Sequence, residues 1–355
     1  MQRFAKMLQV GLVELGHEVR LIQPEPFAGR VRPSGTGVGK WLGYIDKFVF
    51  FPRQLCQAAS RVDVVHICDH PNAVYTKYLQ NVPHLVTCHD LLAIRSALGE
   101  IKENPTKWTG QQLQRMILSG LERSQRIVCN SEQTKRDLLR LTKVDPRIVS
   151  VIYMGLNYLY APMEKAESHK RLNCLGISSN SPFILHIGAN HWYKNRLGVL
   201  AIFNHLRQQT DLSDLYLVMV GKPFTNQMRQ FIQGNSLESQ VKELIAVENE
   251  DLCALYSSAT ALVFPSLQEG FGWPIAEAQA CGCPVFTSDR APMTEVGGDA
   301  AIYINPDRPE QAAREIARKL PNVSKLKQAG LINVRRFTSQ RMLESYVELY
   351  QEICQ

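Results

Sequence analysis

Short runs of apolar residues alternate along this chain with longer segments whose apolar residues recur every three or four positions. Several short runs are almost wholly apolar, as strands are when helices cover both faces of their sheet. We predict strands at 18–22, 63–67, 84–88, 126–130, 148–152, 183–188, 215–221, 261–266 and 284–288. We predict helices between them at 107–124, 131–141, 196–208 and 249–258. This alternation favours an α/β fold with parallel sheets.

A polar stretch at 163–181 separates the earlier strand runs from the later ones. It predicts a linker between two α/β domains, one over 1–160 and the other over 175–337. Open α/β sheets bind ligands at the carboxyl ends of their strands. Two facing sheets would therefore place a ligand in the cleft between the domains.

Composition agrees with this organisation. The chain has 355 residues, 45% of them apolar, which is long enough for two domains. It contains no run of about 18 apolar residues that could span a membrane. Its nine cysteines are scattered, without repeated C-x-x-C pairs, which argues against a structural zinc site and a disulfide framework. We therefore expect a protein of the reducing cytoplasm.

The formal net charge of +7 fits a phosphate-rich ligand or an anionic membrane surface, and we expect no nucleic-acid partner. Between 30 and 61, six basic residues stand against Asp46 alone, among five aromatic residues. Such a segment suits peripheral contact with an anionic membrane, at its inner face. The alternative is a helix packed on its own domain with a solvated basic face.

Two glutamates flank a glycine turn in PSLQEGFGWPIAEAQACGCPV, residues 265–285. The predicted strand 261–266 leads into the turn, and Pro274 suits the first turn of a following helix. The backbone N–H groups of Gly270, Phe271 and Gly272 can therefore face an anion, which the helix dipole also favours. Because glycine has no side chain, a bulky ligand can approach this turn closely.

Glu269 precedes these N–H donors, and Glu277 lies about one turn into the helix. A carboxylate at Glu277 can reach neutral hydroxyls, such as the vicinal pair of a ribose, while the turn holds phosphate. The alternative makes Glu269 a loop charge and Glu277 a helix-surface charge. The agreement of strand, turn and proline favours the ligand site.

The stretch 249–306 resembles the donor-site signature of glycosyltransferase family 4 throughout its length. Four shorter segments also resemble that family: HIGANHWYKN at 186–195, VTCHD at 86–90, CNSEQTKRDL at 129–138 and VIYMGLN at 151–157. The final helix, within 338–355, resembles the one that packs back on the N-terminal domain of these enzymes.

The resemblance implies an α/β protein of two Rossmann-like domains whose parallel sheets face a central cleft, the GT-B arrangement. It implies a retaining transferase of polysaccharide biosynthesis that moves a hexose from a nucleotide diphosphate sugar, of the GDP-mannose or UDP-hexose type. The acceptor would be a hydroxyl of a glycan or lipid-linked glycan. No cofactor and no essential metal are implied, and the sequence has no D-x-D motif.

The catalytic residues that the resemblance implies are Glu269, Lys194 and His89. Glu269 would contact hydroxyls of the transferred sugar, and Lys194 would neutralise the departing diphosphate. His89, with Asp90 beside it, would line the reaction centre from the N-terminal domain. A histidine at a strand end is also often a core or loop residue.

Further substrate-binding residues follow from the same resemblance. Glu277 would hold the nucleotide ribose, and the backbone from Gly270 to Gly272 would bind pyrophosphate or sugar. Gly188, at the end of a predicted strand, would border the same site. From their position alone, and not from the resemblance, Asp69 and His70 at another strand end are weaker candidates for acceptor contact.

The sequence departs from the family pattern at the phosphate site and at the turn. Ala189 and Tyr193 stand where the family often has an arginine. Arg196 could supply that second cation or could face solvent. Trp273 stands where leucine is usual, so its ring either narrows the sugar pocket or packs.

The domain type also predicts a strand and a glycine loop ahead of the first helix, whereas the chain opens on the helix itself. Phe4, Leu8, Leu12 and Leu15 recur at helical spacing, with Gly16 as a C-cap. We expect about 15 further residues before Met1 in the natural protein, one strand and one loop. The alternative is a rearranged N-terminus whose helix caps a smaller sheet.

Two other functions fit part of the sequence. One is a nucleotide-sugar epimerase with the same two-domain plan, and the other is a degenerate sugar-nucleotide binding protein without transfer activity. A nicotinamide dehydrogenase is disfavoured because no G-x-G-x-x-G follows a strand. The donor base, the hexose and the acceptor stay open.

Overall fold

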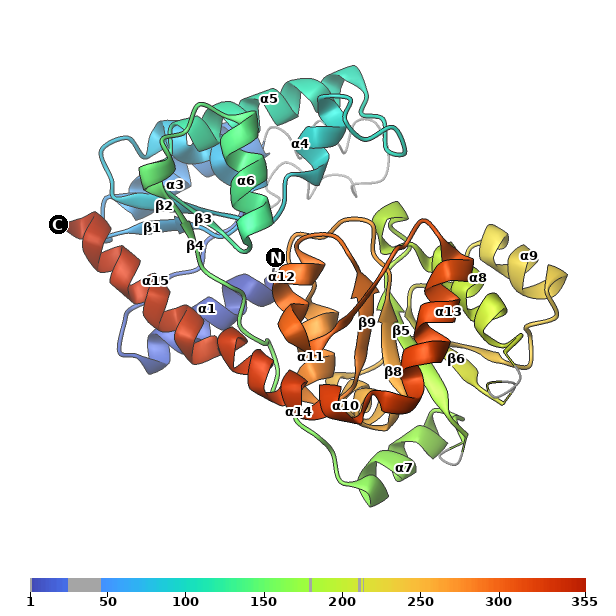
Figure 1. The fold of residues 1–355 in the computed structure, drawn as a ribbon. Coiled ribbons are helices and arrows are strands. Elements are labelled where there is room, and N and C mark those ends of the chain that lie inside the picture. The colour runs from blue at the N-terminus through green and yellow to red at the C-terminus, as the bar shows by residue number, and fades with distance from the viewer. Residues whose placement is uncertain (1, 25–45, 179–180, 210–211, 213) are drawn as a thin grey trace. The chain divides into compact units, whose positions relative to one another are not determined.

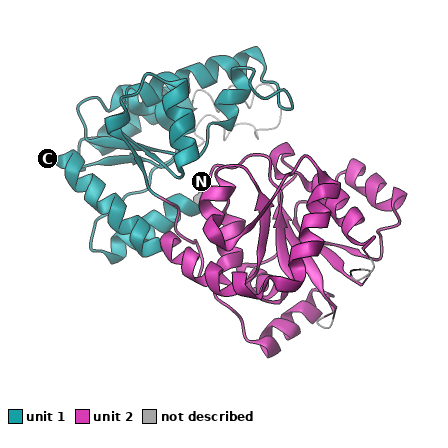
Figure 2. Cartoon of the chain, in the orientation of Figure 1, with its two compact units in different colours: residues 1–152, 339–355 teal, residues 153–338 magenta. Residues whose placement is uncertain are grey.

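The computed structural model of the chain describes residues 2–24, 46–178, 181–209, 212 and 214–355. The chain divides into two compact units, shown in Figure 2. Unit 1 comprises residues 1–152 and 339–355, and unit 2 comprises residues 153–338. Each unit has its own parallel sheet, as the ribbon in Figure 1 shows.

Unit 1 is built on a four-stranded parallel sheet in the order β1-β2-β3-β4. The strands are β1 Val65–Ile67, β2 His84–Cys88, β3 Arg126–Cys129 and β4 Val149–Val151. The helices are α3 Phe51–Ala59, α4 Leu92–Ala97, α5 Trp108–Glu122 and α6 Glu132–Leu141, with a 3₁₀ helix at His70–Tyr78. Strand β2 is buried along its whole length, as a strand between two neighbours and under helices should be.

The two ends of the described chain meet in unit 1, where α1 (Gln2–Glu14) packs on α15 (Ser339–Cys354). The ring of His66 on β1 hydrogen-bonds the Tyr350 hydroxyl of α15 at 2.7 Å and the Thr87 hydroxyl of β2 at 2.7 Å. Thr87 also bonds the hydroxyl of Tyr346 at 2.9 Å. Burial lowers the pKa of His66 to about 3, so the ring is neutral. This buried network fixes the last helix against the sheet.

Unit 2 has a six-stranded parallel sheet in the order β10-β9-β8-β5-β6-β7. The strands are β5 Phe183–Gly188, β6 Tyr216–Gly221, β7 Val241–Ile245, β8 Ala261–Phe264, β9 Val285–Ser288 and β10 Ile302–Ile304. The chain builds the sheet outward from β5 on one side and then returns to β8 on the other. The order therefore reverses between β5 and β8, which is where open α/β sheets place their ligands.

Helices cover both faces of the unit 2 sheet (Figure 1). The helices of unit 2 are α7 Lys165–Cys174, α8 Arg196–Leu206, α9 Asn226–Gly234, α10 Asn249–Ser258, α11 Trp273–Ala280, α12 Met293–Gly297, α13 Pro309–Lys319 and α14 Ser324–Asn333. The core under α8, α9 and α13 buries large side chains such as Phe203, Met219 and Phe286 completely. These contacts hold the loops at the strand ends on a rigid base.

Most predicted elements are confirmed, but the strand at 18–22 and the linker at 163–181 are wrong, and two strands are missing from the prediction. Residues 18–22 form no strand, and Leu21 there is 51% exposed, because no neighbouring strand of the described chain pairs with them. Strands β7 and β10 are absent from the prediction, because the adjacent charged residues Lys242 and Glu243 interrupt the apolar run of β7 and because β10 is only three residues long. The expected linker at 163–181 contains α7, which buries Leu172 and pairs Arg171 with Asp251 of α10 at 3.0 Å.

The predicted N-terminal helix is confirmed, with Phe4, Leu8 and Leu12 buried and Gly16 at φ +88° after its end. Leu15 differs from the expectation, because it lies beyond the last helical turn and is exposed.

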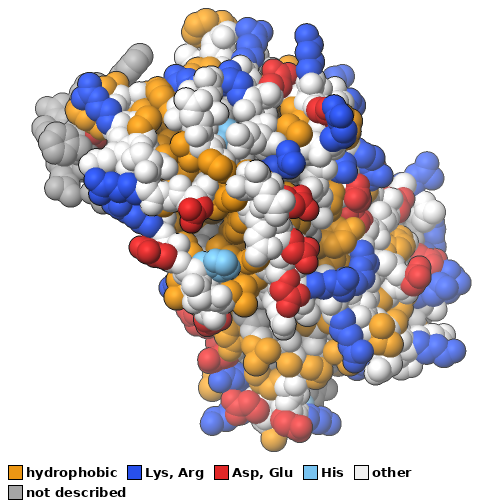
Figure 3. Space-filling view, turned by 90° about the vertical axis from the view of Figure 1, so that its left-hand side faces the viewer, with side chains coloured by type: hydrophobic (Ala, Val, Ile, Leu, Met, Phe, Trp, Pro, Cys, Tyr) orange, Lys and Arg blue, Asp and Glu red, His pale blue; other side chains and the backbone are white. Residues whose placement is uncertain are grey.

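The basic aromatic segment 30–61 is described only from residue 46 onward, and residues 30–45 lie outside the described part. Helix α3 buries Phe51, Leu55 and Ala59 in unit 1, as the packed-helix alternative predicts. Figure 3 shows one face of the molecule on which Lys and Arg side chains are interspersed with acidic and apolar ones. Contact with a membrane stays a prediction.

Among the helices of the described residues, none has the length and apolar character needed to cross a bilayer.

Helix α5 packs closely on the segment around Ala73 at Gly120. A Cβ at Gly120 would lie 2.2 Å from the Ala73 carbonyl oxygen and 2.4 Å from its carbon. Because backbone cannot retreat as a flexible side chain can, Gly120→Ala should destabilise unit 1 by about 1–3 kcal/mol. Urea denaturation followed by circular dichroism measures this change.

Gly234, at the end of α9, is the matched control, because nothing lies within 4 Å of a Cβ built there. Gly234→Ala should leave stability unchanged or raise it by up to about 1 kcal/mol. Equal unfolding midpoints for the two variants would contradict the close packing at Gly120.

Candidate active site

A part-buried ion pair joins the loops that follow β5 and β8. The ammonium of Lys194 donates to Glu269 Oε1 at 2.7 Å, and the two side chains are only 16% and 8% exposed. Lys194 follows β5 through the 3₁₀ turn Trp192–Lys194, and Glu269 follows β8. The pair therefore lies at the point where the strand order reverses.

The position of Lys194 is fixed by the backbone around it. Leu267 N–H donates to the Tyr193 carbonyl at 2.7 Å, which ties the two loops together. The next residue, Asn195, adopts the left-handed conformation at φ 53°, and its side-chain amide donates to the Pro265 carbonyl at 3.1 Å. Asn195 was not among the predicted site residues, although asparagine is enriched at such positions.

The glycine turn leads directly into α11. Gly272 precedes the helix at φ 104°, a conformation that favours glycine. The ring of Phe271 is buried and packs edge-on against Phe337 at 5.4 Å. The aromatic ring thus anchors the turn in unit 2, next to the N-terminus of α11.

Glu277 lies inside α11 and is buried, so the helix-surface alternative is wrong. The hydroxyl of Tyr256 on α10 donates to Glu277 Oε2 at 2.8 Å. The Glu269 side chain is only 8% exposed and is paired with Lys194, so it is not a simple loop charge. Tyr256 was missed by the sequence reasoning, because a tyrosine in an apolar helix predicts only core packing.

Arg196 does not face solvent, so that alternative is also wrong. It is 4% exposed, and Nη1 donates to Asn190 Oδ1 and to the Lys222 carbonyl, the latter at 2.7 Å. Its Nε and Nη2 are buried without a hydrogen bond in the described residues. Burial lowers its pKa, and the charge of Glu243 opposes that shift. Arg196 therefore connects the loops after β5 and β6.

Gly188 ends β5 beside Gly221, which ends β6. A Cβ at Gly221 would lie 2.0 Å from the Gly188 carbonyl oxygen, so the two backbones touch here. Trp273, the first residue of α11, is half-buried, and its indole N–H is buried without a hydrogen-bond partner among the described residues. Its ring is neither fully packed away nor fully exposed.

The predicted residues of unit 1 gather at the carboxyl ends of β1 and β2. His89 is buried, its Nε2 donates to the Cys68 carbonyl at 2.9 Å, and Phe4 packs edge-on against its ring at 4.9 Å. Burial lowers the pKa of His89 to about 4, so its ring is neutral at pH 7. Asp90 accepts the Leu92 N–H at 3.0 Å, at the start of α4.

Asp69 and His70 lie at the same edge, with His70 Nδ1 3.6 Å from Asp69 Oδ1. Burial raises the pKa of Asp69 to about 6, with the charge of Asp90 adding to the shift and that of Lys47 opposing it. A carboxyl group with this pKa can accept or release a proton near neutrality.

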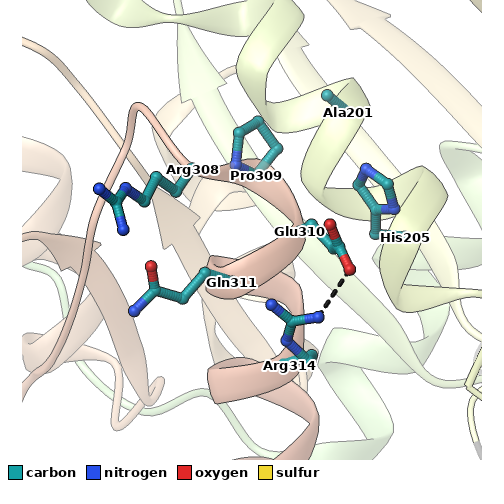
Figure 4. A pocket seen from close by; sticks show the side chains of 7 residues that line it. All are labelled: Ala201, His205, Arg308, Pro309, Glu310, Gln311 and Arg314. Carbon is teal, nitrogen blue, oxygen red and sulfur yellow. Dashed lines mark hydrogen bonds and ion pairs between the residues drawn. The ribbon is translucent and has the colours of Figure 1, made fainter.

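A pocket on the outside of unit 2 contains none of the predicted site residues. Residues of α8 and of the start of α13 line it, among them His205, Arg308 and Arg314 (Figure 4). Its one ion pair joins Glu310 and Arg314, and each of these side chains is about three-fifths exposed. Within the part of the chain that the structure describes, no three His, Cys, Asp or Glu side chains cluster in a way that could hold a metal.

Each of the two units is an α/β domain with a parallel sheet, and in unit 2 the paired Lys194 and Glu269 lie where the strand order reverses. Together they define a two-domain protein of the Rossmann-like class. Two family models match the chain: "Glycosyltransferase Family 4" over residues 1–158 and "Glycosyl transferases group 1" over residues 170–331. Together they match most of the chain, and the chain belongs to glycosyltransferase family 4.

The chain is also similar to curated relatives. It is 23% identical over 286 residues to O-antigen chain mannosyltransferase B of Escherichia coli, covering 78% of this chain and 75% of that protein. It is 27% identical over 209 residues to O-antigen chain mannosyltransferase RfbU of Salmonella typhimurium, covering 58% and 55%. For D-inositol 3-phosphate glycosyltransferase of Corynebacterium diphtheriae, the identity is 23% over 267 residues, covering 72% and 61%.

Solved structures confirm the predicted GT-B fold class. Sucrose-phosphate synthase of Thermosynechococcus elongatus matches with a TM-score of 0.78 at 18% identity, covering 99% of this chain and 92% of that one. HepE of Anabaena, solved in complex with UDP and glucose, matches with a TM-score of 0.73 at 18% identity, covering 96% and 88%. At this identity the likeness shows the fold alone.

We expect a strong energetic coupling between Lys194 and Glu269. Lys194→Met should destabilise unit 2 by about 3 kcal/mol, because it leaves the buried Glu269 carboxylate without its cation. Adding Glu269→Gln should recover part of this loss, with a coupling energy of about 1–3 kcal/mol in a double-mutant cycle. Urea denaturation of the wild type, the two single variants and the double variant measures this coupling energy.

The exposed pair Glu310–Arg314, with a separation of 2.6 Å, is the matched control. The same cycle with Glu310→Gln and Arg314→Met should give a coupling below about 0.5 kcal/mol. A Lys194–Glu269 coupling as small as that of the control pair would show that the loops are not held together by this ion pair.

Proposed function

We propose that this protein is a retaining glycosyltransferase that moves a hexose from a nucleotide diphosphate sugar to a hydroxyl of a glycan or lipid-linked glycan. The observation that carries the proposal is the Lys194–Glu269 pair beside the glycine turn and the N-terminus of α11. A cation, a carboxylate and backbone N–H groups in one place match a diphosphate bonded to a sugar.

In the proposed complex, the diphosphate takes the place of Glu269 as the anionic partner of Lys194. Negative charge grows on the diphosphate as the bond to the sugar breaks, so a fixed ammonium there stabilises the transition state. Glu269, released from Lys194, accepts hydrogen bonds from hydroxyls of the transferred sugar. The N-terminus of α11 adds its partial positive charge next to the same phosphates.

The remaining predicted residues have roles consistent with their positions. Glu277 holds the ribose, while Gly188 and the turn 270–272 let the donor approach the backbone. Trp273 borders the sugar, and its buried indole N–H can donate a hydrogen bond to a sugar hydroxyl. Arg196 supports the phosphate site by bonding Asn190 in the loop that leads to Lys194.

On the acceptor side, we propose that His89 and Asp90 of unit 1 line the reaction centre. The neutral ring of His89 suits a hydrogen-bonding role rather than charge stabilisation. The similarity to O-antigen mannosyltransferases favours a glycan acceptor and a role in polysaccharide biosynthesis. HepE was solved with UDP and glucose, which supports a nucleotide sugar as donor. We propose that transfer needs no metal, on the family resemblance alone.

Glu269→Gln should lower the transfer rate at saturating donor by about 100-fold or more, as expected when charged contacts to the reacting sugar are lost. The fold should persist, because glutamine has the size of glutamate and its amide oxygen can still accept the hydrogen bond from Lys194. Steady-state transfer from UDP- and GDP-hexoses to a glycan acceptor gives the rate. Glu310→Gln, an exposed carboxylate on α13, is the control and should transfer at the wild-type rate. Equal rates in both variants would remove Glu269 from the mechanism.

Lys194→Ala should weaken binding of a nucleoside diphosphate by about 10- to 100-fold, since a charge-assisted contact to phosphate is lost. Titration calorimetry with UDP and GDP measures the affinity. Lys222→Ala, another lysine following a strand of the same sheet, is the comparison variant and should have a smaller effect. Unchanged diphosphate affinity in Lys194→Ala would mean that Lys194 serves only as the partner of Glu269.

A further inference from the structure

The hydroxyl of Tyr256 is a buried polar group that has no role in the transfer mechanism proposed above. Tyr256 lies on α10, its side chain is fully buried, and its hydroxyl donates to Glu277 Oε2 at 2.8 Å. A buried carboxylate is costly unless hydrogen-bond donors compensate its charge. The bond to Tyr256 is thus one reason why Glu277 can be charged inside the protein.

The packing of α10 on α11 places Tyr256 next to Glu277. Cys253 and Tyr256 are three residues apart on α10, and Glu277 and Cys281 are four apart on α11 and just beyond it. Residues with these spacings share a helix face. Tyr256 hydrogen-bonds Glu277 across the two helices, and the neighbouring Cys281 thiol lowers the pKa of the Cys253 thiol. Helices α10 and α11 therefore pack with these two faces toward each other.

The ring of Tyr256 is itself held in place. It packs edge-on against Tyr160 with ring centroids 6.1 Å apart, and the Tyr160 hydroxyl bonds Asn249 Oδ1 at 3.3 Å at the start of α10. Burial and the charge of Glu277 raise the pKa of Tyr256 well above its usual value. The phenol therefore keeps its proton and always acts as the donor.

From these contacts we infer that Tyr256 is a positioning residue that orients the Glu277 carboxylate toward the ribose hydroxyls of the donor. The hydrogen bond fixes Oε2 against α10, which restricts rotation of the carboxylate about its last bond. A carboxylate oriented before binding loses less conformational freedom when it accepts hydroxyl hydrogen bonds. This inference rests on the proposed function, because it assigns Tyr256 to the nucleotide-sugar site.

Discrimination between ribose and 2′-deoxyribose tests this role. Titration calorimetry compares UDP with 2′-deoxy-UDP, and GDP with 2′-deoxy-GDP, on the full chain. The wild type should prefer the ribonucleotide. Tyr256→Phe keeps the ring and removes only the hydroxyl, and it should reduce that preference by about fivefold, as loss of one hydrogen bond to a charged group predicts. Glu277→Gln should reduce the preference at least as far.

Tyr160→Phe is the matched control, because it removes a neighbouring phenol whose hydroxyl bonds Asn249. It should keep the wild-type preference. Thermal unfolding of each variant shows whether the fold is retained at the temperature of titration. If Tyr256→Phe weakens binding of both forms equally, or changes neither, Tyr256 only packs in the core and the inference is wrong.

Two further results separate this inference from the proposed function. If the wild type binds the diphosphates without preferring ribose, the role of Tyr256 falls while the nucleotide site stands. If the wild type binds neither UDP nor GDP, the proposed function itself fails, and the role of Tyr256 with it.

Discussion

The ion pair between Lys194 and Glu269 is the contact around which the proposed site is organised. It joins the loops after β5 and β8, the two strands between which the order of the unit 2 sheet reverses. Opposite charges with little solvent around them attract strongly, but each would be costly alone. A bound diphosphate and sugar would offer each member of the pair a new partner. The same contact can thus hold the site in shape before the donor binds and be exchanged for contacts to the donor when it does.

Much of the surrounding structure keeps these loops and α11 in place. Asn195 ties the start of α8 to the end of β8, and Arg196 ties the loop after β5 to the loop after β6. On the other side of the turn, Phe271 inserts its ring beside Phe337, and Tyr256 fixes Glu277. A site that binds a charged transition state must be organised before the reaction, because rearrangement during the reaction would cost free energy. These buried contacts supply that order.

The sequence predicted the strand ends well and the contacts between them poorly. Apolar runs identify buried strands such as β5 and β8, and a glycine turn before Pro274 identifies the start of α11, because both depend on local chemistry. Strand β7 escaped prediction because Lys242 and Glu243 interrupt its apolar pattern. Residues 18–22 have a strand-like composition, but no strand among the described residues pairs with them. The Tyr256–Glu277 bond joins residues from two helices, so no local pattern could indicate it.

Hydrogen exchange of the backbone amides, measured with and without UDP or GDP, tests the central claim most directly, because it locates binding without a substitution. A bound diphosphate should slow exchange in two segments of unit 2, 186–196 and 268–278, since Lys194 and the turn before α11 would both contact it. The pocket between α8 and α13 should exchange at the same rate in both states. Slower exchange at that pocket, with no change in the two segments, would contradict the account and place the nucleotide elsewhere.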